Sequence, residues 1–219
     1  MPARAPAGYG PAMAARPELD HLILGVPDLE AAMDEFERRF GIRPVPGGSH
    51  PGQGTRNALV GLGPGRYLEL LAPDPEQASG GPLLELVRRG PRLVGWCART
   101  SALDECVAQA RERGYDPGDP RRGERRTREG ALLTWRFTAV PPPVGDGVVP
   151  FLIDWGETPH PSEALPTFGS LRALRAEHPR PDDVRPALAA LGIELPLAAG
   201  PQPALIAVIA TASGTVELR

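Results

Sequence analysis

The stretch LDHLILGVPDLEAAMDEFERRFG, residues 19–41, reads as a buried strand followed by an amphipathic helix. Pro27 stops the strand, Asp28 stands where it can cap the helix, and Gly41 supplies the C-terminal stop. The helix carries one apolar stripe, made of Leu29, Ala32, Met33, Phe36 and Phe40. The stretch therefore predicts a strand that packs one of its faces against the helix that follows it.

Strand candidates continue after this helix. A Gly-rich loop separates the helix from NALVGL at 57–62, and a GPG turn joins that segment to RYLELLA at 66–72. Residues 42–47 complete the series as a short strand. The first unit thus has the order strand, helix, strand, strand, strand and occupies residues 18–79.

The same order begins again after a short linking helix at 80–92. Ser101 and Asp104 form a capping-box pattern, and the helix that they open ends at Gly114, thirteen residues after Ser101, as Asp28 and Gly41 are thirteen apart. The expected strands of this second unit are 93–98, 117–125, 131–140 and 148–155. The chain therefore predicts an α+β fold of two paired βαβββ modules, 18–79 and 93–155, whose sheets curl around a shared central trough.

The two ends of the chain do not repeat this unit. Residues 1–17 are expected to be a flexible leader, and residues 156–219 a C-terminal α/β extension packed on the core. Within the extension the pattern predicts a helix at 181–192 and two strands over 203–219, whereas 170–178 fits either a helix or a strand. His160 and His178 stand among prolines and are expected to be exposed loop residues.

Composition narrows the class of protein. Of the 219 residues 41% are hydrophobic and 23% charged, which is typical of a globular chain. The net charge of −3 argues against a nucleic-acid partner, and no apolar run is long enough to span a membrane. With no signal peptide and two sparse cysteines, Cys97 and Cys106, a cytoplasmic protein with buried thiols is expected. The one basic cluster, RRGERRTR at 121–128, reads as the solvated face of a hairpin, with an arginine rim for an anionic small molecule as the alternative.

One histidine interrupts the first strand. Side chains alternate along a strand, so Leu19, His21 and Ile23 are expected to share a face that points into the trough. Leu22 and Leu24 then face the helix.

A carboxylate interrupts the strand at 66–72 in the same way. Alternation places Tyr67, Glu69 and Leu71 on one face, and a buried carboxylate needs a partner. His21 and Glu69 together start a divalent-metal site, or act without metal as a base and its orienting group. A third interpretation is a buried pair that only satisfies its own hydrogen bonds.

A family resemblance follows from these segments. The run LDHLILGVPDLEAAMDEFERRFGI, followed by YLELLAPDP, resembles the first module of the vicinal oxygen chelate superfamily, and the loop HPGQGTRNALVGLG resembles its glyoxalase-like branch, a glyoxalase/bleomycin resistance/dioxygenase-like group. Members of this superfamily pair βαβββ modules, and many bind a divalent metal in the trough for isomerase, dioxygenase or thiol-transfer chemistry. Others bind drugs without catalysis.

The resemblance implies a set of ligands. The metal ligands fall on His21 and Glu69, while the second module departs from the pattern: Trp96 stands where glyoxalase I has a histidine, and the last-strand carboxylate is Asp154. The expected site is therefore His21 and Glu69 with Asp154, His50 or substrate completing it.

Further residues are expected to contact the ligand. His50, Thr55 and Asn57 lie in or beside the Gly-rich loop, Trp96 would form an apolar wall, and Arg99 would meet a substrate carboxylate. The leading function is a glyoxalase-like enzyme that acts on a small organic molecule by metal-assisted proton transfer, isomerisation or lyase chemistry, with His21 and Glu69 as catalytic residues. The alternatives are a non-catalytic binder that sequesters a small molecule and a scaffold with a filled trough; a homodimer is left open.

Overall fold

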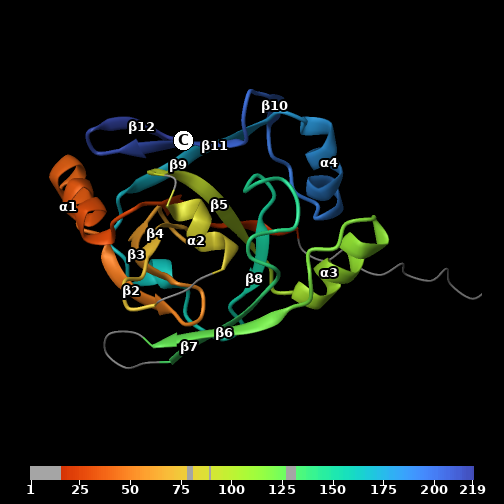
Figure 1. The fold of residues 1–219 in the computed structure, drawn as a ribbon, viewed down its shortest axis with the longest axis horizontal. Helices are drawn as coiled ribbons and strands as arrows, with labels where there is room; N and C mark the ends of the chain where they lie inside the picture. Colours follow the sequence, from red (N-terminus) through yellow and green to blue (C-terminus); the bar gives the residue numbers. More distant parts are fainter. Residues whose placement is uncertain (1–15, 78–80, 89, 127–131) are drawn as a thin grey trace, which may run out of the picture.

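The computed structural model describes residues 16–77, 81–88, 90–126 and 132–219 (Figure 1). Most of the expected leader, residues 1–15, lies outside the described residues. Among the helices of the described part, none combines the length and the apolar character needed to cross a membrane.

The first half of the chain forms one four-strand unit with a helix. Its elements are β1 (Glu18–Gly25), α1 (Leu29–Phe40), β2 (Val45–His50), β3 (Thr55–Gly61) and β4 (Tyr67–Pro73). A short helix follows, α2 (Pro82–Val87). The second unit repeats the order with β5 (Arg92–Arg99), α3 (Leu103–Glu112), β6 (Arg121–Arg126), β7 (Leu132–Phe137) and β8 (Phe151–Asp154).

These strands form one eight-stranded sheet with the order β2-β3-β4-β1-β5-β8-β7-β6. In each unit the first strand pairs in parallel with the last, β1 with β4 and β5 with β8, and the two units join where β1 pairs antiparallel with β5. The predicted fold class, paired βαβββ modules around a curled sheet, is confirmed.

The curl brings the two edge strands together. The guanidinium of Arg125 in β6 donates from Nη1 to the backbone carbonyl of Gly47 in β2 at 2.7 Å. The sheet is therefore nearly closed, as the wrapped strands in Figure 1 show, and its inner face encloses a space that both units line.

Helix α1 forms as its sequence predicts. The Asp28 carboxylate accepts the backbone N–H of Ala31 at 3.0 Å, and Gly41 ends the helix with φ of 70°, a left-handed conformation that suits glycine. The side chains of Leu29, Met33 and Phe36 are buried. On the solvent side Arg43 forms ion pairs with three carboxylates of this helix, Glu30, Asp34 and Glu37.

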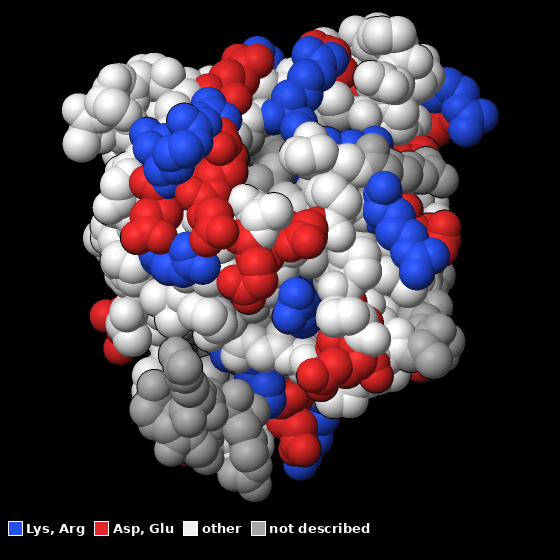
Figure 2. Space-filling model, turned by 60° about the vertical axis from the view of Figure 1, so that its left-hand side comes forward, with Lys and Arg blue, Asp and Glu red and all other residues white. Residues whose placement is uncertain are grey.

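Acidic and basic side chains are interspersed over the face that Figure 2 turns forward, which comes from the α1 side of the view in Figure 1. No single-sign basic field is visible on this face of the described residues.

Helix α3 differs from the prediction at its first turn. Ser101 was expected to cap it, but Ala102 occupies the cap position and makes no side-chain hydrogen bond there. The Thr100 hydroxyl instead accepts the N–H of Ala102 at 3.1 Å, so the prediction for Ser101 is wrong. The buried stripe is as expected: Leu103, Cys106, Val107 and Ala110.

Apolar side chains divide into two clusters. The larger one includes Leu22, Leu68 and Leu152 from the sheet together with the buried residues of α1 and α3, so it fills the outer layer. The smaller one includes Ile23, Leu71 and residues of β5 and β8 on the opposite face of the sheet. The middle strands β4, β1, β5 and β8 are thus apolar on both faces, as strands covered on both sides must be.

The rest of the chain adds a second sheet. Its strands, in the order β10-β9-β11-β12, are β10 (Leu197–Ala199), β9 (Gly169–His178), β11 (Ala204–Thr211) and β12 (Gly214–Leu218). This part of the chain also contains helix α4 (Pro181–Ala190) and the short 3-10 helix η1 (Pro161–Glu163). Residues 170–178, which the pattern left undecided, are thus a strand.

Contacts tie this sheet to the first one. Gly61 of β3 forms a parallel bridge with Thr167, and the side chains of the extension share the outer apolar cluster. His178 is 4% exposed, and a backbone N–H bonds its Nδ1, so the expectation of an exposed loop residue is wrong for it.

Candidate functional site

The inner face of the curled sheet encloses a cavity of about 390 Å³. Its apolar wall includes Ile23 and Leu71 from the first unit and Trp135, Phe137 and Phe151 from the second. Its polar lining includes His21, His50, Asn57, Glu69 and Arg125.

Strand β4 places Glu69 in this cavity as alternation predicts. Tyr67, Glu69 and Leu71 line the space, whereas Leu68 and Leu70 pack in the outer cluster. The parallel register sets His21 of β1 opposite Tyr67, and the two rings stack with their centroids 4.5 Å apart.

Strand β1 departs from strict alternation at one point. Leu19 pairs with Ala98 and His21 with Cys97, so Asp20 is an extra residue, a β-bulge. Because of the bulge, the neighbouring side chains of Asp20 and His21 reach each other, and Asp20 Oδ1 lies 2.6 Å from His21 Nδ1. Leu19 packs against the outer cluster, so the expectation that it shares the face of His21 is wrong.

Asp20 is the centre of a buried network. Its side chain is fully buried, and its Oδ2 accepts hydrogen bonds from Trp155 Nε1 and His160 Nε2, each at 3.0 Å. Burial alone would raise the pKa of this carboxyl, but the hydrogen bonds from His160 and His21 outweigh it and hold the pKa well below its ordinary value. Asp20 is therefore ionised at neutral pH.

The charge on Asp20 fixes both histidines that touch it. An ionised carboxylate only accepts, so His21 donates to Asp20 from Nδ1, and in the neutral ring the lone pair is on Nε2. The backbone N–H of Ser162 donates to His160 Nδ1 at 3.2 Å, so His160 carries its proton on Nε2. His160 belongs to the segment after the second unit; its side chain is 14% exposed and bonded, so the expectation of an exposed loop residue is wrong for it too.

Nε2 of His21 faces Glu69. His21 Nε2 lies 3.6 Å from Glu69 Oε2. Both residues are buried, with His21 4% exposed and Glu69 7% exposed. The other oxygen of the carboxylate, Oε1, accepts a hydrogen bond from Asn57 Nδ2 at 2.6 Å. Asp20 therefore holds His21 through Nδ1, and Asn57 holds Glu69 through Oε1. The other two atoms, His21 Nε2 and Glu69 Oε2, face each other at the cavity wall.

His50 adjoins this pair. Its Nδ1 lies 3.0 Å from the hydroxyl of Thr55, and its Nε2 lies 3.3 Å from Asn57 Nδ2. Burial, together with the positive charge of Arg125, lowers the pKa of His50 although Glu69 opposes the shift. A neutral His50 donates to Thr55 and accepts from Asn57, which satisfies both ring nitrogens. Thr55 itself is fully buried and contacts His50 without belonging to the cavity lining.

Three expected site residues lie elsewhere. Asp154 lies in β8 beside the lining residues Phe151 and Ile153, but it is absent from the lining and bonds the N–H of Gly156. The expectation that Asp154 completes a metal site is therefore wrong in position.

Trp96 and Arg99 are also outside the cavity lining. Trp96 packs in the outer cluster and donates from Nε1 to the Val148 carbonyl at 2.8 Å. Arg99 donates to the Gly65 carbonyl and pairs with Glu18, so it ties the end of β5 to the β3–β4 turn. Neither residue lines the cavity as expected. Trp96 is on the outer face because its neighbour Cys97 is the residue of β5 that pairs with His21, and Arg99 is engaged with Gly65 and Glu18.

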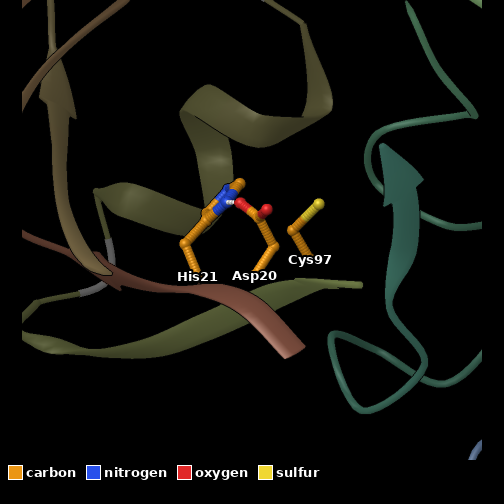
Figure 3. Close-up of side chains that lie close together, drawn as sticks. All are labelled: Asp20, His21 and Cys97. Carbon is orange, nitrogen blue, oxygen red and sulfur yellow. Dashed lines mark hydrogen bonds and ion pairs between the residues drawn. The ribbon is translucent and has the colours of Figure 1, made fainter. Parts of the chain in front are cut away.

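Asp20, His21 and Cys97 are the described residues whose ligand atoms gather within 4.8 Å of one another (Figure 3). This trio fits a metal ion poorly. Both oxygens of Asp20 already accept hydrogen bonds, and burial, with the negative charges of Asp20 and Glu69, raises the pKa of the Cys97 thiol well above its ordinary value.

His21 and Glu69 fit a divalent ion better. A metal-binding histidine nearly always donates its second N–H to a carboxylate or carbonyl, as His21 does to Asp20. Two ligands about 2.1 Å from one ion stand about 3.4 Å apart at a tetrahedral angle, and Nε2 and Oε2 are 3.6 Å apart. The pair supplies two ligands, and cavity molecules would supply the others.

The strand order, the paired units and the polar pair in the enclosed trough define a class: α+β proteins built from two βαβββ modules around a ligand-sized cavity. A glyoxalase-like domain model matches residues 19–192. The chain therefore belongs to the glyoxalase-like domain family, and it has the paired-module fold expected of the vicinal oxygen chelate superfamily. None of the curated proteins compared with it matches.

Several solved structures are similar to this chain at low identity. A hypothetical protein from Staphylococcus aureus aligns with a TM-score of 0.70 and 14% identity over 93% of this chain and 99% of that one. A triple mutant of 4-hydroxymandelate synthase from Streptomyces coelicolor aligns with a TM-score of 0.52 and 17% identity, over 94% of this chain and 63% of that one. A methylmalonyl-CoA epimerase in complex with methylmalonyl-CoA aligns with a TM-score of 0.45 and 22% identity, over 67% of this chain and all of that one.

Sequence reasoning missed Asp20, Trp155 and His160. Asp20 stands next to His21 in the chain, and a bulge that lets both side chains meet has no signal in a run of alternating residues. The partners of Asp20 lie more than 130 residues away and only the folded sheet brings them together.

Proposed function

We propose that this protein is an enzyme that moves a proton on a small organic molecule bound in the cavity, with His21 and Glu69 as its reactive pair. The observation that carries the proposal is the 3.6 Å approach of His21 Nε2 to Glu69 Oε2 at the wall of an otherwise largely apolar cavity. Two polar atoms that converge in an apolar pocket are the common feature of small-molecule sites.

Each residue around the pair has a defined part. Asp20 orients His21 and keeps the lone pair on Nε2, and Asn57 holds Oε1 of Glu69 so that Oε2 is the oxygen that gives or takes the proton. Trp135 and Phe137 give the same space apolar walls, and low polarity strengthens electrostatic interactions there.

A divalent metal ion fits this site, with His21 Nε2 and Glu69 as its protein ligands. When bound, it would polarise a carbonyl or enolate oxygen of the ligand and so ease the loss of a neighbouring proton.

Metal titration of protein purified without a histidine tag tests the proposal. The wild type is expected to bind one equivalent of Co²⁺ or Zn²⁺, as measured by calorimetry and by the Co²⁺ absorption spectrum. His21→Ala and Glu69→Ala are expected to lose this binding, whereas Asp154→Asn is the matched control, because Asp154 lies outside the cavity lining. A wild type that stays metal-free at saturating concentrations refutes the metal-assisted form.

Non-catalytic binding is the second candidate, favoured by the aromatic wall of Trp135, Phe137, Phe151 and Trp155. It predicts that an apolar ligand raises the melting temperature of both the wild type and Glu69→Gln by the same amount, with no product. Deuterium exchange next to a carbonyl group, catalysed by the wild type and lost in Glu69→Gln, would exclude it in favour of the enzyme.

A further inference from the structure

We propose that the ligand of this cavity is a carboxylate with an apolar body, whose charge is bound by Arg125 and whose body lies against Trp135 and Trp155. This inference rests on the proposed function, because it takes the cavity as the place where the ligand binds. It goes further by naming the chemical class of the ligand and the residues that select it, Arg125, Trp135 and Trp155.

The basic residues of β6 lie at the cavity. Arg122 and Arg125 both belong to the lining, although the sequence alone favoured a solvated face for this cluster. Arg125 is half-buried, and its bond to the Gly47 carbonyl fixes the guanidinium where β6 meets β2. An arginine fixed in this way loses little further side-chain freedom on binding a ligand.

Arg125 has donors suited to a carboxylate. A guanidinium carries five N–H groups in a planar fork, and the bond to Gly47 uses one of them. The remaining edge matches the two oxygens of a carboxylate, which arginine binds in a bidentate manner.

The charge of Arg125 reaches the reactive end of the cavity. It contributes to the lowered pKa of His50, after burial, and it opposes the rise in the pKa of Tyr67 that burial causes. Arg125 thus offsets part of the negative charge of Asp20 and Glu69 at these rings, which lowers the cost of placing a singly charged anion beside them. Glu69 and Glu124 also line the cavity, so a singly charged carboxylate suits it better than a doubly charged phosphate.

Aromatic rings form the other part of the proposed subsite. Trp135 and Trp155 have ring centroids 5.4 Å apart, and both line the cavity. Trp135 lies close against β6, because a Cβ on Gly123 would stand 2.4 Å from its Nε1. The absence of a side chain at Gly123 therefore lets the indole lie back against the strand and leaves the space in front of it open.

The size of the cavity agrees with one small molecule. Its volume of about 390 Å³ lies in the lower part of the range of about 300–1,000 Å³ for small-molecule sites. A benzoate-sized acid with an alkyl substituent combines the charge and the apolar body that the lining calls for.

Calorimetry with 4-tert-butylbenzoate and its neutral analogue 4-tert-butylbenzamide tests the inference. The two probes share one shape and differ in charge. In the wild type the carboxylate is expected to bind at least about tenfold more tightly than the amide, since a charge-assisted bond is roughly twice as strong as a neutral one. The preference is expected to fall as salt is raised.

Arg125→Gln is expected to bring the two affinities to within about twofold, with that for the amide unchanged. Unchanged amide binding shows that the cavity is intact. Arg175→Gln, which alters an arginine paired with Glu217 in the second sheet, is the control and should keep the wild-type preference.

Equal affinities in the wild type, or an undiminished preference in Arg125→Gln, would overturn the inference, and so would failure of both probes to bind. These measurements need neither metal nor turnover. A wild type that prefers the carboxylate but binds no metal and catalyses no exchange would contradict the proposed function alone.

Discussion

Replacing Asp20 by Asn tests the network that orients His21. The amide has one acceptor oxygen and one donor nitrogen, whereas both oxygens of Asp20 accept. Two donors, Trp155 Nε1 and His160 Nε2, converge on Oδ2, and an indole can only donate. The amide oxygen is therefore expected to stay with these two, so that the amide nitrogen faces His21.

The consequence is a change of tautomer. Facing an N–H donor, His21 Nδ1 must become the acceptor, and the proton moves to Nε2, where it occupies the lone pair that faces Glu69. Loss of such an outer partner of a histidine ligand costs about 10–100-fold in metal affinity or activity. A hydrogen bond to a carboxylate contributes about 1.5–3 kcal/mol and a neutral one about 0.5–1.5 kcal/mol, so three bonds weakened by about 1–1.5 kcal/mol each imply about 3–4.5 kcal/mol of lost stability.

Long-range ¹H–¹⁵N correlation spectra of the imidazole rings measure the tautomer directly. The chain has four histidines, and His21→Gln assigns the relevant signals. The wild type is expected to carry the His21 proton on Nδ1, and Asp20→Asn on Nε2, while Asp154→Asn matches the wild type. A His21 that keeps its proton on Nδ1 in Asp20→Asn would show that the carboxylate does not set the tautomer, and the reasoning would fail.

Three other predictions concern the same region. His160→Ala is expected to lower the metal affinity, measured by calorimetry, or the activity. His160→Gln should restore part of the loss, because its amide can donate a hydrogen bond to Asp20. Equal losses in both variants would argue against a hydrogen-bonding role for His160. Gly123→Ala is expected to push Trp135 into the cavity, because the new Cβ would stand 2.4 Å from the indole. Ligand binding should weaken at least about tenfold, and the tryptophan fluorescence should change. Unchanged binding and fluorescence would contradict this packing of Trp135 on Gly123. The pKa of Asp20 is lower in the folded state than in the unfolded state, so the stability that this carboxylate contributes is complete above the ordinary pKa of 3.8 and is lost as the pH falls below it. Urea unfolding between pH 6 and pH 3 should therefore show a steeper loss of stability in the wild type than in Asp20→Asn. Parallel losses of stability in the two proteins would contradict the shift.

Much of the fold follows from local sequence patterns. The apolar stripe of α1, its Asp28 cap and its Gly41 stop need only neighbours along the chain, and so does the alternation that places Glu69 in the cavity. The repeated order of elements was sufficient to predict the paired modules.

The rest of the site depends on relations that alternation does not encode. Trp96 and Asp154 were assigned by correspondence between the two units, but the register of β5 turns Cys97 toward His21, and Asp154 stands outside the lining. His160 reaches Asp20 only because the chain after β8 returns to the start of β1. A contact between residues so far apart in the chain leaves no periodic pattern in the sequence.

The bulge in β1 also makes the strand sensitive to its residue count. Strict alternation would send Asp20 and His21 to opposite faces, and one inserted residue allows them to act together. Deleting Asp20 would therefore remove the bulge together with the carboxylate: Leu19 would become the direct neighbour of His21, and regular alternation would keep Leu19 in the outer cluster and leave His21 in the cavity without its partner. The polar centre of the trough is thus set by chain length as much as by residue type, and natural variants that differ by one residue here should differ in chemistry even where His21 and Glu69 are kept.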